Sequence, residues 1–213
     1  MPVLDSKKYA IALHTSTPQL GIAVKNYAGD SRSHTWDLGR GLASGLQKYL
    51  AEILHPQTWQ DLEFIAVAKG PGGFTGTRVG VVTARTIAQQ LNIPLFGISN
   101  LAAVAAQNID NNFSDDCLLA VQMDARRGEL FVGIYQVKNQ RLQTYMQDTL
   151  MAQAIWQKTL EDLQHPYQLI NAEGNIATSV TNVLDLAYAA WKEGLEPHWS
   201  EIVPYYGQHP VTS

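Results

Sequence analysis

The fold class is decided by the stretch Phe64-Ile-Ala-Val-Ala-Lys-Gly-Pro-Gly-Gly-Phe-Thr-Gly-Thr-Arg-Val-Gly80. Its first five residues are continuously apolar, which is typical of a strand buried on both faces. The glycine turn at 70–73 then leads into a helical pattern that runs to Asn92. A second strand is predicted at Pro94–Ile98, with a further helix capped by Ser99. This alternation of strand and helix predicts an α/β protein with a parallel component.

The residues before this stretch predict paired strands and one helix. Two apolar runs, Tyr9–His14 and Leu20–Val24, are joined by a short turn that contains Pro18. Together with Ser33–Trp36 they predict an antiparallel meander. Apolar residues then recur at steps of three and four over Leu42–Ile53, which predicts an amphipathic helix.

The second half begins after a polar stretch, Asn108–Asp116, which is the best candidate for a domain boundary. We therefore expect an N-terminal part, residues 1–107, and a smaller C-terminal part, residues 108–213. Paired strands are predicted at Cys117–Val121 and Leu130–Tyr135, around a charged hinge. Glutamine-rich residues 136–168 indicate polar surface and helix, followed by a strand at 167–170 and a last helix over 176–192.

Composition limits the classes of function. The 213 residues carry 15 Lys and Arg against 19 Asp and Glu, a net charge of −4, with a pI near 5.8. Such a chain is not expected to bind nucleic acid strongly by itself. Charged residues are only 16% of the chain, against roughly 25% in an average domain, so a partner could cover uncharged surface. A single cysteine, Cys117, excludes an internal disulfide and a cysteine-rich zinc site.

No targeting segment or membrane span is expected. The N-terminus has no apolar run behind a basic start, and the longest uncharged stretch, residues 86–109, is interrupted by polar residues and a proline. The sequence therefore predicts a cytoplasmic protein.

The glycine turn has two possible roles. Glycines between a buried strand and a helix let the backbone approach an anion, but no G-x-G-x-x-G or Gly-Lys-Ser/Thr pattern is present. Packing is the second role. Gly76, Gly80, Ala84 and Ala88 recur every fourth residue and form one stripe of small residues on the helix.

This stripe predicts a helix–helix contact, because two glycines in a helix cost roughly 1 kcal/mol each relative to alanine and a close approach could offset that cost. The second helix could belong to another chain or to this one, where the Leu42–Ile53 helix is the candidate. The predicted partner interface combines the stripe with apolar residues of the preceding helix: Leu42, Leu46, Gly76, Gly80, Ala84 and Ala88. On this hypothesis Gly80→Leu would abolish association and leave the monomer folded.

Three ordered motifs resemble the TsaB (YeaZ) family. They are Gly70-Pro-Gly-Gly-Phe-Thr-Gly-Thr-Arg-Val-Gly80, Met123-Asp-Ala-Arg-Arg-Gly-Glu-Leu130 and Ile11-Ala-Leu-His-Thr-Ser-Thr17. The resemblance implies a fold of the actin / sugar-kinase / Hsp70 ATPase (ASKHA) type, with two subdomains of mixed sheet and helices, the second one reduced.

The resemblance also implies a function. Members of this family are partners of the enzyme TsaD, which acts with TsaE to install N6-threonylcarbamoyladenosine (t6A) in tRNA. The chain is thus expected to be a non-catalytic dimerisation or activating subunit that binds a TsaD-like enzyme and a TsaE-like ATPase. Docking and self-association would use the helices at 39–54 and 74–91. The chain would contact tRNA only as part of the complex.

No catalytic, cofactor-binding or metal-binding residue is predicted. The six histidines form no H-x-x-x-H pair, the spacing that places two metal ligands on one helix face. The family's first strand ends in Leu-Asp-Thr-Ser-Thr, and here His14 occupies the aspartate position. An imidazole is a poor substitute for a carboxylate towards Mg²⁺, so an autonomous nucleotide site is not expected.

Three arginines are candidates for a contact with a partner or between subdomains. Arg78 lies early in the predicted long helix, and Arg126 and Arg127 lie in the charged hinge between paired strands. A guanidinium fork binds a carboxylate or another anion, although a solvated hinge or an internal ion pair would explain these residues equally. The alternative function is an ATP-dependent phosphotransferase of the same fold acting on a small metabolite, which ATP titration would reveal.

Overall fold

The structure is a computed structural model that describes residues 4–109, 113–114, 116–138 and 141–207. It divides into two compact units. Unit 1 comprises residues 1–100 and 177–205, and unit 2 comprises residues 101–176 and 206–213.

Unit 1 is built on a five-stranded sheet with the order β3-β2-β1-β4-β5. Its strands are β1 (Tyr9–His14), β2 (Gln19–Lys25), β3 (Ser31–Asp37), β4 (Leu62–Ala68) and β5 (Leu95–Ile98). The first three strands form the predicted antiparallel meander, whereas β4 pairs in parallel with both β1 and β5. The central strand β1 is buried along its whole length, which explains why its residues before His14 are apolar.

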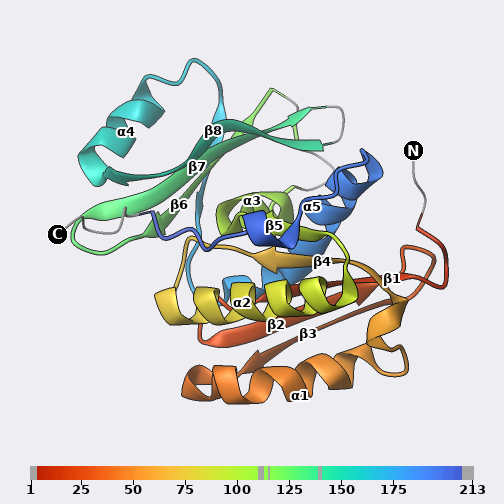
Figure 1. Cartoon of the computed structure of the whole chain (residues 1–213). Helices are drawn as coiled ribbons and strands as arrows, with labels where there is room; N and C mark the ends of the chain where they lie inside the picture. Colours follow the sequence, from red (N-terminus) through yellow and green to blue (C-terminus); the bar gives the residue numbers. More distant parts are fainter. Residues whose placement is uncertain (1–3, 110–112, 115, 139–140, 208–213) are drawn as a thin grey trace. The chain divides into compact units, whose positions relative to one another are not determined.

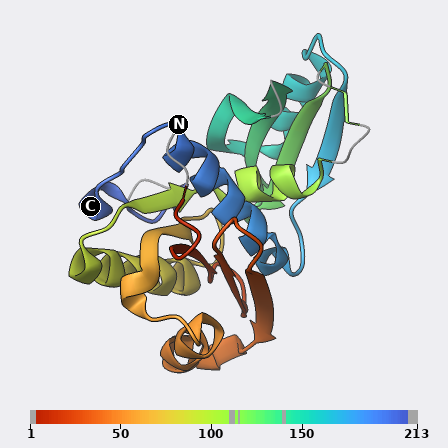
Figure 2. The same ribbon diagram turned by 90° about the vertical axis from the view of Figure 1, so that its right-hand side faces the viewer.

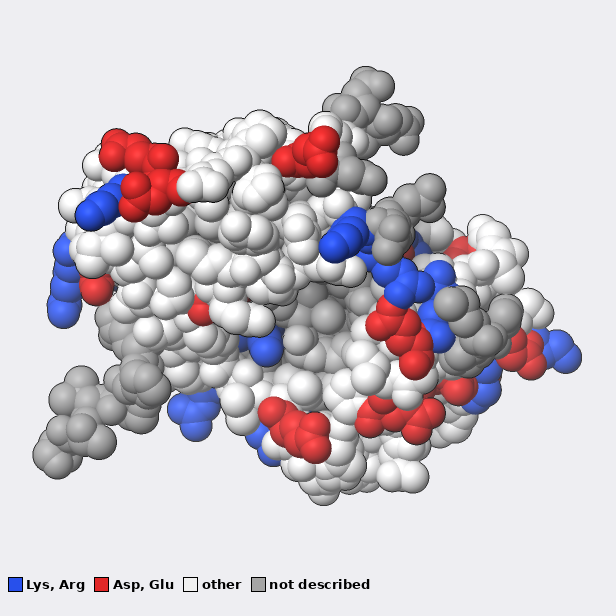
Figure 3. All heavy atoms as spheres, turned by 90° about the horizontal axis from the view of Figure 1, so that it is seen from above, with Lys and Arg blue, Asp and Glu red and all other residues white. Residues whose placement is uncertain are grey.

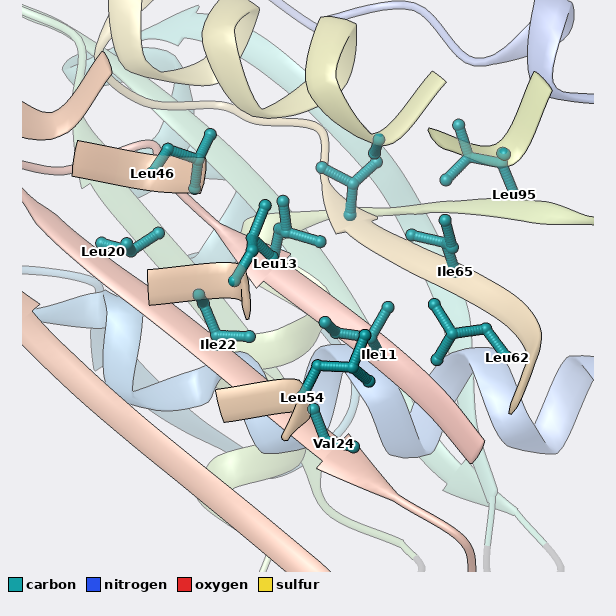
Figure 4. Packing of buried hydrophobic residues seen from close by; sticks show 14 of the residues in the cluster. Ile11, Leu13, Leu20, Ile22, Val24, Leu46, Leu54, Leu62, Ile65 and Leu95 are labelled. Carbon is teal, nitrogen blue, oxygen red and sulfur yellow. The ribbon is translucent and has the colours of Figure 1, made fainter. Parts of the chain in front are cut away.

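Helices cover both faces of this sheet (Figures 1 and 2). On one face lie α1 (Leu42–Leu54) and α2 (Phe74–Leu91), and their buried residues share one core with β1, β2 and β4. Figure 4 shows Leu46 and Leu54 of α1 next to strand residues of this core. On the other face lies α5 (Val180–Lys192), whose Trp191 ring stacks on Phe64 of β4 at a centroid distance of 5.9 Å.

Unit 2 contains a four-stranded sheet with the order β8-β7-β6-β9. Its strands are β6 (Leu118–Asp124), β7 (Glu129–Lys138), β8 (Arg141–Ala152) and β9 (Tyr167–Asn171). The helix α4 (Gln153–Glu161) buries Trp156 and Leu160 against β6 and β7. A second core on this unit includes Leu101 and Val104 of α3 (Asn100–Gln107).

The predicted fold class is confirmed, because each unit carries a mixed sheet packed with helices. The division at 107/108 differs from the structure, because residues 177–205 return to unit 1, where α5 covers the sheet. Part of the predicted boundary stretch, residues 110–112 and 115, lies outside the described residues. Among the residues that are described, no helix is both long and apolar enough to cross a membrane.

Candidate protein-interaction surface

The small-residue stripe of α2 faces the sheet of its own unit. Gly80, Ala84 and Ala88 are fully or almost fully buried, and Gly76 is half-buried. A Cβ atom on Gly76 would lie 2.0 Å from the carbonyl oxygen of Thr15, and one on Gly80 would lie 2.1 Å from Thr15 Oγ1. The glycines therefore let α2 approach the end of β1, where Thr15 Oγ1 donates a hydrogen bond of 2.8 Å to the Gly76 carbonyl.

Leu42 and Leu46 of α1 also belong to the core of unit 1, with exposed fractions of 6% and 2%. All six residues predicted to line a partner interface thus pack within their own chain. The four-residue spacing of small residues correctly predicted close packing of α2. The predicted neighbour, another helix, was wrong, because α2 packs on the chain's own first strand and the turn after it.

The outer side of α2 remains accessible. Phe74 is 59% exposed and Val82 is 52% exposed, and the exposed side chain of Arg78 lies one helical turn from each of them. A groove of about 450 Å³ separates this helix from α1. Its lining mixes apolar and uncharged polar groups: Gln47, Leu50, Ala51, Trp59, Val82, Thr83, Thr86 and Ile87. Uncharged, partly apolar surface of this kind is suited to contact with another protein.

The glycine turn before α2 is closed by contacts inside unit 1. The amide of Gly73 donates to the carbonyl oxygen of Ser16 at 2.8 Å, and a Cβ on Gly72 would lie 2.7 Å from Ser16 Cβ. Asn100 is fully buried and holds the turn from the other side: its Oδ1 accepts from the Gly70 amide, and its Nδ2 donates to the Pro71 carbonyl. Sequence reasoning missed Asn100, because an asparagine after Ser99 reads as an ordinary helix start.

His14 ends β1 and is completely buried. Burial lowers the pKa of its imidazole to about 4, so the side chain is neutral at pH 7. Neither ring nitrogen has a hydrogen-bond partner among the described residues. A neutral imidazole of this kind would be a poor Mg²⁺ ligand, and the Gly73 amide is already engaged. The residues at this end of β1 therefore do not fit the metal and phosphates of a nucleotide.

The three candidate arginines are exposed and do not form one cluster within a unit. Arg78 belongs to unit 1, whereas Arg126 and Arg127 lie in the β6–β7 turn of unit 2. The internal ion pair considered for Arg78 is not found within the described part of the chain, where Lys25 pairs with Asp185 and Arg32 pairs with Asp30. The described residues contain no group of three or more His, Cys, Asp or Glu side chains that could hold a metal ion.

Comparison with solved structures defines the class of protein. The chain superposes on a crystal structure from Pseudomonas aeruginosa described as an uncharacterized protein with similarity to peptidase YEAZ, with a TM-score of 0.74. This match covers 94% of the present chain and 100% of the other at 22% sequence identity, and a structure titled YeaZ from the same organism gives the same TM-score. The two-unit α/β architecture is therefore that of the YeaZ fold.

Sequence comparison gives the family. A family model described as "TsaD: tRNA N6-adenosine threonylcarbamoyltransferase" matches residues 40–194. The TsaB protein of Bacillus subtilis is 41% identical over 107 residues, and that of Escherichia coli is 36% identical over 128 residues. These alignments cover 50% and 59% of the present chain, and 45% and 54% of the two relatives. The chain belongs to this TsaD-type family, and the two relatives compared above are TsaB proteins. The chain spans about half the length of the curated relatives it matches.

Proposed function

We propose that this chain is a non-catalytic subunit in the biosynthesis of t6A in tRNA, and that it binds and supports a TsaD-like threonylcarbamoyltransferase. Membership of the family carries this proposal, because curated relatives from several bacteria are named tRNA threonylcarbamoyladenosine biosynthesis protein TsaB. The proposed partners are a TsaD-like catalytic subunit and a TsaE-like ATPase, with tRNA met only through the complex. Because tRNA is the proposed target, the expected compartment is the cytoplasm.

The docking surface in this proposal is the outer face of α1 and α2, and not the small-residue stripe. Phe74 and Val82 are large, exposed and apolar. The groove beside Val82 could bind a side chain from a helix of the partner. In the isolated chain, we propose that a second copy occupies the same face and forms a homodimer. The six residues predicted to form the interface lie beneath this face and pack α1 and α2 on the sheet.

A supporting role without chemistry agrees with the state of the turn at the end of β1. The Gly73 amide is already bonded to Ser16, and His14 is buried and neutral at the position where the family resemblance leads one to expect a carboxylate. A chain built in this way would activate its partner by contact. The phosphotransferase alternative gains no support from these residues.

Reconstitution tests the proposal. The chain would be mixed with a TsaD-like protein, a TsaE-like ATPase, threonylcarbamoyl-adenylate and an unmodified tRNA transcript, and t6A would be measured by mass spectrometry. We expect t6A only when this chain is present together with the TsaD-like protein. Full t6A formation without the chain, or turnover of ATP on a small acceptor by the chain alone, would contradict the proposal.

A further inference from the structure

The turn between β6 and β7 has an unusual backbone for its residues. Arg126, Arg127 and Gly128 all have positive φ angles, of 68°, 55° and 78°. The turn is closed by two backbone hydrogen bonds, from Ala125 to the Glu129 carbonyl at 3.0 Å and from Glu129 to the Arg126 carbonyl at 3.1 Å. Hairpin turns of this hand usually hold glycine, asparagine or aspartate.

Arginine at both positions therefore weakens the turn. A left-handed conformation brings the Cβ of an L-residue too close to the following carbonyl oxygen, and glycine or asparagine tolerates it better than arginine does. Residues in such unfavourable backbone conformations are often found at functional sites. The two arginine side chains are therefore expected to have a function other than stabilising the fold.

The two side chains present positive charge to solvent. Both arginines are exposed, and no carboxylate within the described part of the chain forms an ion pair with them. Two acidic residues flank the turn, Asp124 and the half-buried Glu129, and Asp124 uses its Oδ1 to accept a hydrogen bond of 2.8 Å from the Arg126 backbone amide. That bond supports the turn and leaves the two guanidinium groups available.

We propose that Arg126 and Arg127 form a phosphate-binding element that holds the backbone of an RNA in the assembled complex. This inference rests on the proposed function, which supplies the RNA. A guanidinium fork matches the oxygens of a phosphate in a bidentate manner, and phosphate contacts position an RNA without reading its sequence. Positioning of this kind suits a subunit that does not perform the chemistry itself.

RNA fits this turn better than an acidic protein surface does. A protein interface needs an apolar core, and none of the exposed large hydrophobic side chains in the described ranges belongs to residues 124–129. A contact with RNA phosphodiesters does not need an apolar core. Figure 3 shows acidic and basic side chains interspersed on the face it presents, with no broad basic area. Together with the net charge of −4, this indicates that the turn adds to RNA binding by a larger assembly.

The test uses the complex of the full chain with the TsaD-like protein and an unmodified tRNA transcript. The variant R126N/R127N removes both charges and keeps residues that tolerate the left-handed backbone. The control K138N/K158N removes two charges from exposed positions of the same unit. We expect the first variant to bind tRNA roughly tenfold more weakly near 0.1 M salt, with a slope of log K against log salt about 1.5 smaller. The control should match the wild type.

Three results would overturn the inference. They are an unchanged salt slope in R126N/R127N, an equal change in the control, and lost binding of the TsaD-like protein with intact RNA affinity, which would assign the turn to a protein contact. Failure of the wild-type chain to bind the TsaD-like protein at all would instead refute the proposed function. Co-purification of the wild-type pair, measured first, separates the two cases.

Discussion

Gly80 shows how one missing side chain sets the position of a helix. Alanine is the better helix residue by about 1 kcal/mol, but its Cβ would lie 2.1 Å from Thr15 Oγ1. We expect Gly80→Ala to destabilise the chain by about 1–3 kcal/mol, the range for an overpacked core, as measured by urea unfolding. This replaces the expectation that Gly80→Leu would leave the monomer folded.

A double-mutant cycle identifies the cause of that loss. Thr15→Ala removes the clashing oxygen, so Gly80→Ala should cost at least about 1 kcal/mol less in the Thr15→Ala background. Gly45→Ala in α1 is the control, because its nearest neighbour is the flexible Tyr49 ring at 3.2 Å, and it should not lower stability. Equal costs of Gly80→Ala in both backgrounds would show that Thr15 is not the obstacle.

His14 should make stability depend on pH. Its pKa is about 4 in the folded chain and about 6.5 when unfolded, so the unfolded state binds the proton more tightly. Above about pH 6.5, His14 therefore does not change the free energy of unfolding. As the pH falls from 6.5 towards 4, protonation of His14 in the unfolded state lowers the free energy of unfolding by about 3 kcal/mol in total. His14→Leu should abolish this part of the loss in urea titrations at pH 7 and pH 4.5. His55→Gln, at an exposed position, should retain it.

At the scale of the element, α2 packs its inner face on the sheet of its own unit, and we propose that its outer face binds a partner. Val82→Glu places a charge on the outer face, where the side chain is already 52% exposed, so the free energy of unfolding should change by no more than about 0.5 kcal/mol. Association with a second copy or with the TsaD-like protein should weaken at least tenfold, as followed by sedimentation velocity. Ile155→Glu on α4, 59% exposed, is the matched control and should associate normally.

Element predictions succeeded where the apolar pattern is regular and failed where the pattern is mixed. The helix at Leu42–Ile53 and the strand at Phe64–Ala68 appear as α1 and β4 within two residues at each end. The twelve-residue strand β8 was missed, because none of its residues is fully buried, exposed and half-buried residues do not alternate regularly, and its sequence is rich in polar residues. The small-residue stripe likewise predicted which face of α2 packs closely. The spacing of small residues does not indicate whether the neighbouring element is a helix or a strand.

At the scale of the whole molecule, unit 1 is completed by residues that lie far along the chain. The helix α5 covers one face of its sheet, and Trp191 stacks on Phe64. Further on, the amide of Leu95 donates to the Pro197 carbonyl at 3.1 Å, and the amide of Tyr205 donates to the Lys69 carbonyl at 2.7 Å. The sequence carries no local sign of this return, because long-range packing leaves no periodic signal.

A fragment of residues 1–107, the predicted N-terminal domain, should therefore not fold alone. Without α5 it would expose the apolar side chains under that helix, and by circular dichroism and urea titration it should show no cooperative unfolding. Adding a peptide of residues 174–207 should restore a cooperative transition, because it supplies α5 and the backbone groups of Pro197 and Tyr205 that form hydrogen bonds with Leu95 and Lys69. The same peptide with Trp191→Ala should restore less, since it lacks the ring that stacks on Phe64. A cooperative transition of the fragment by itself would show that the sheet is stable without its second layer.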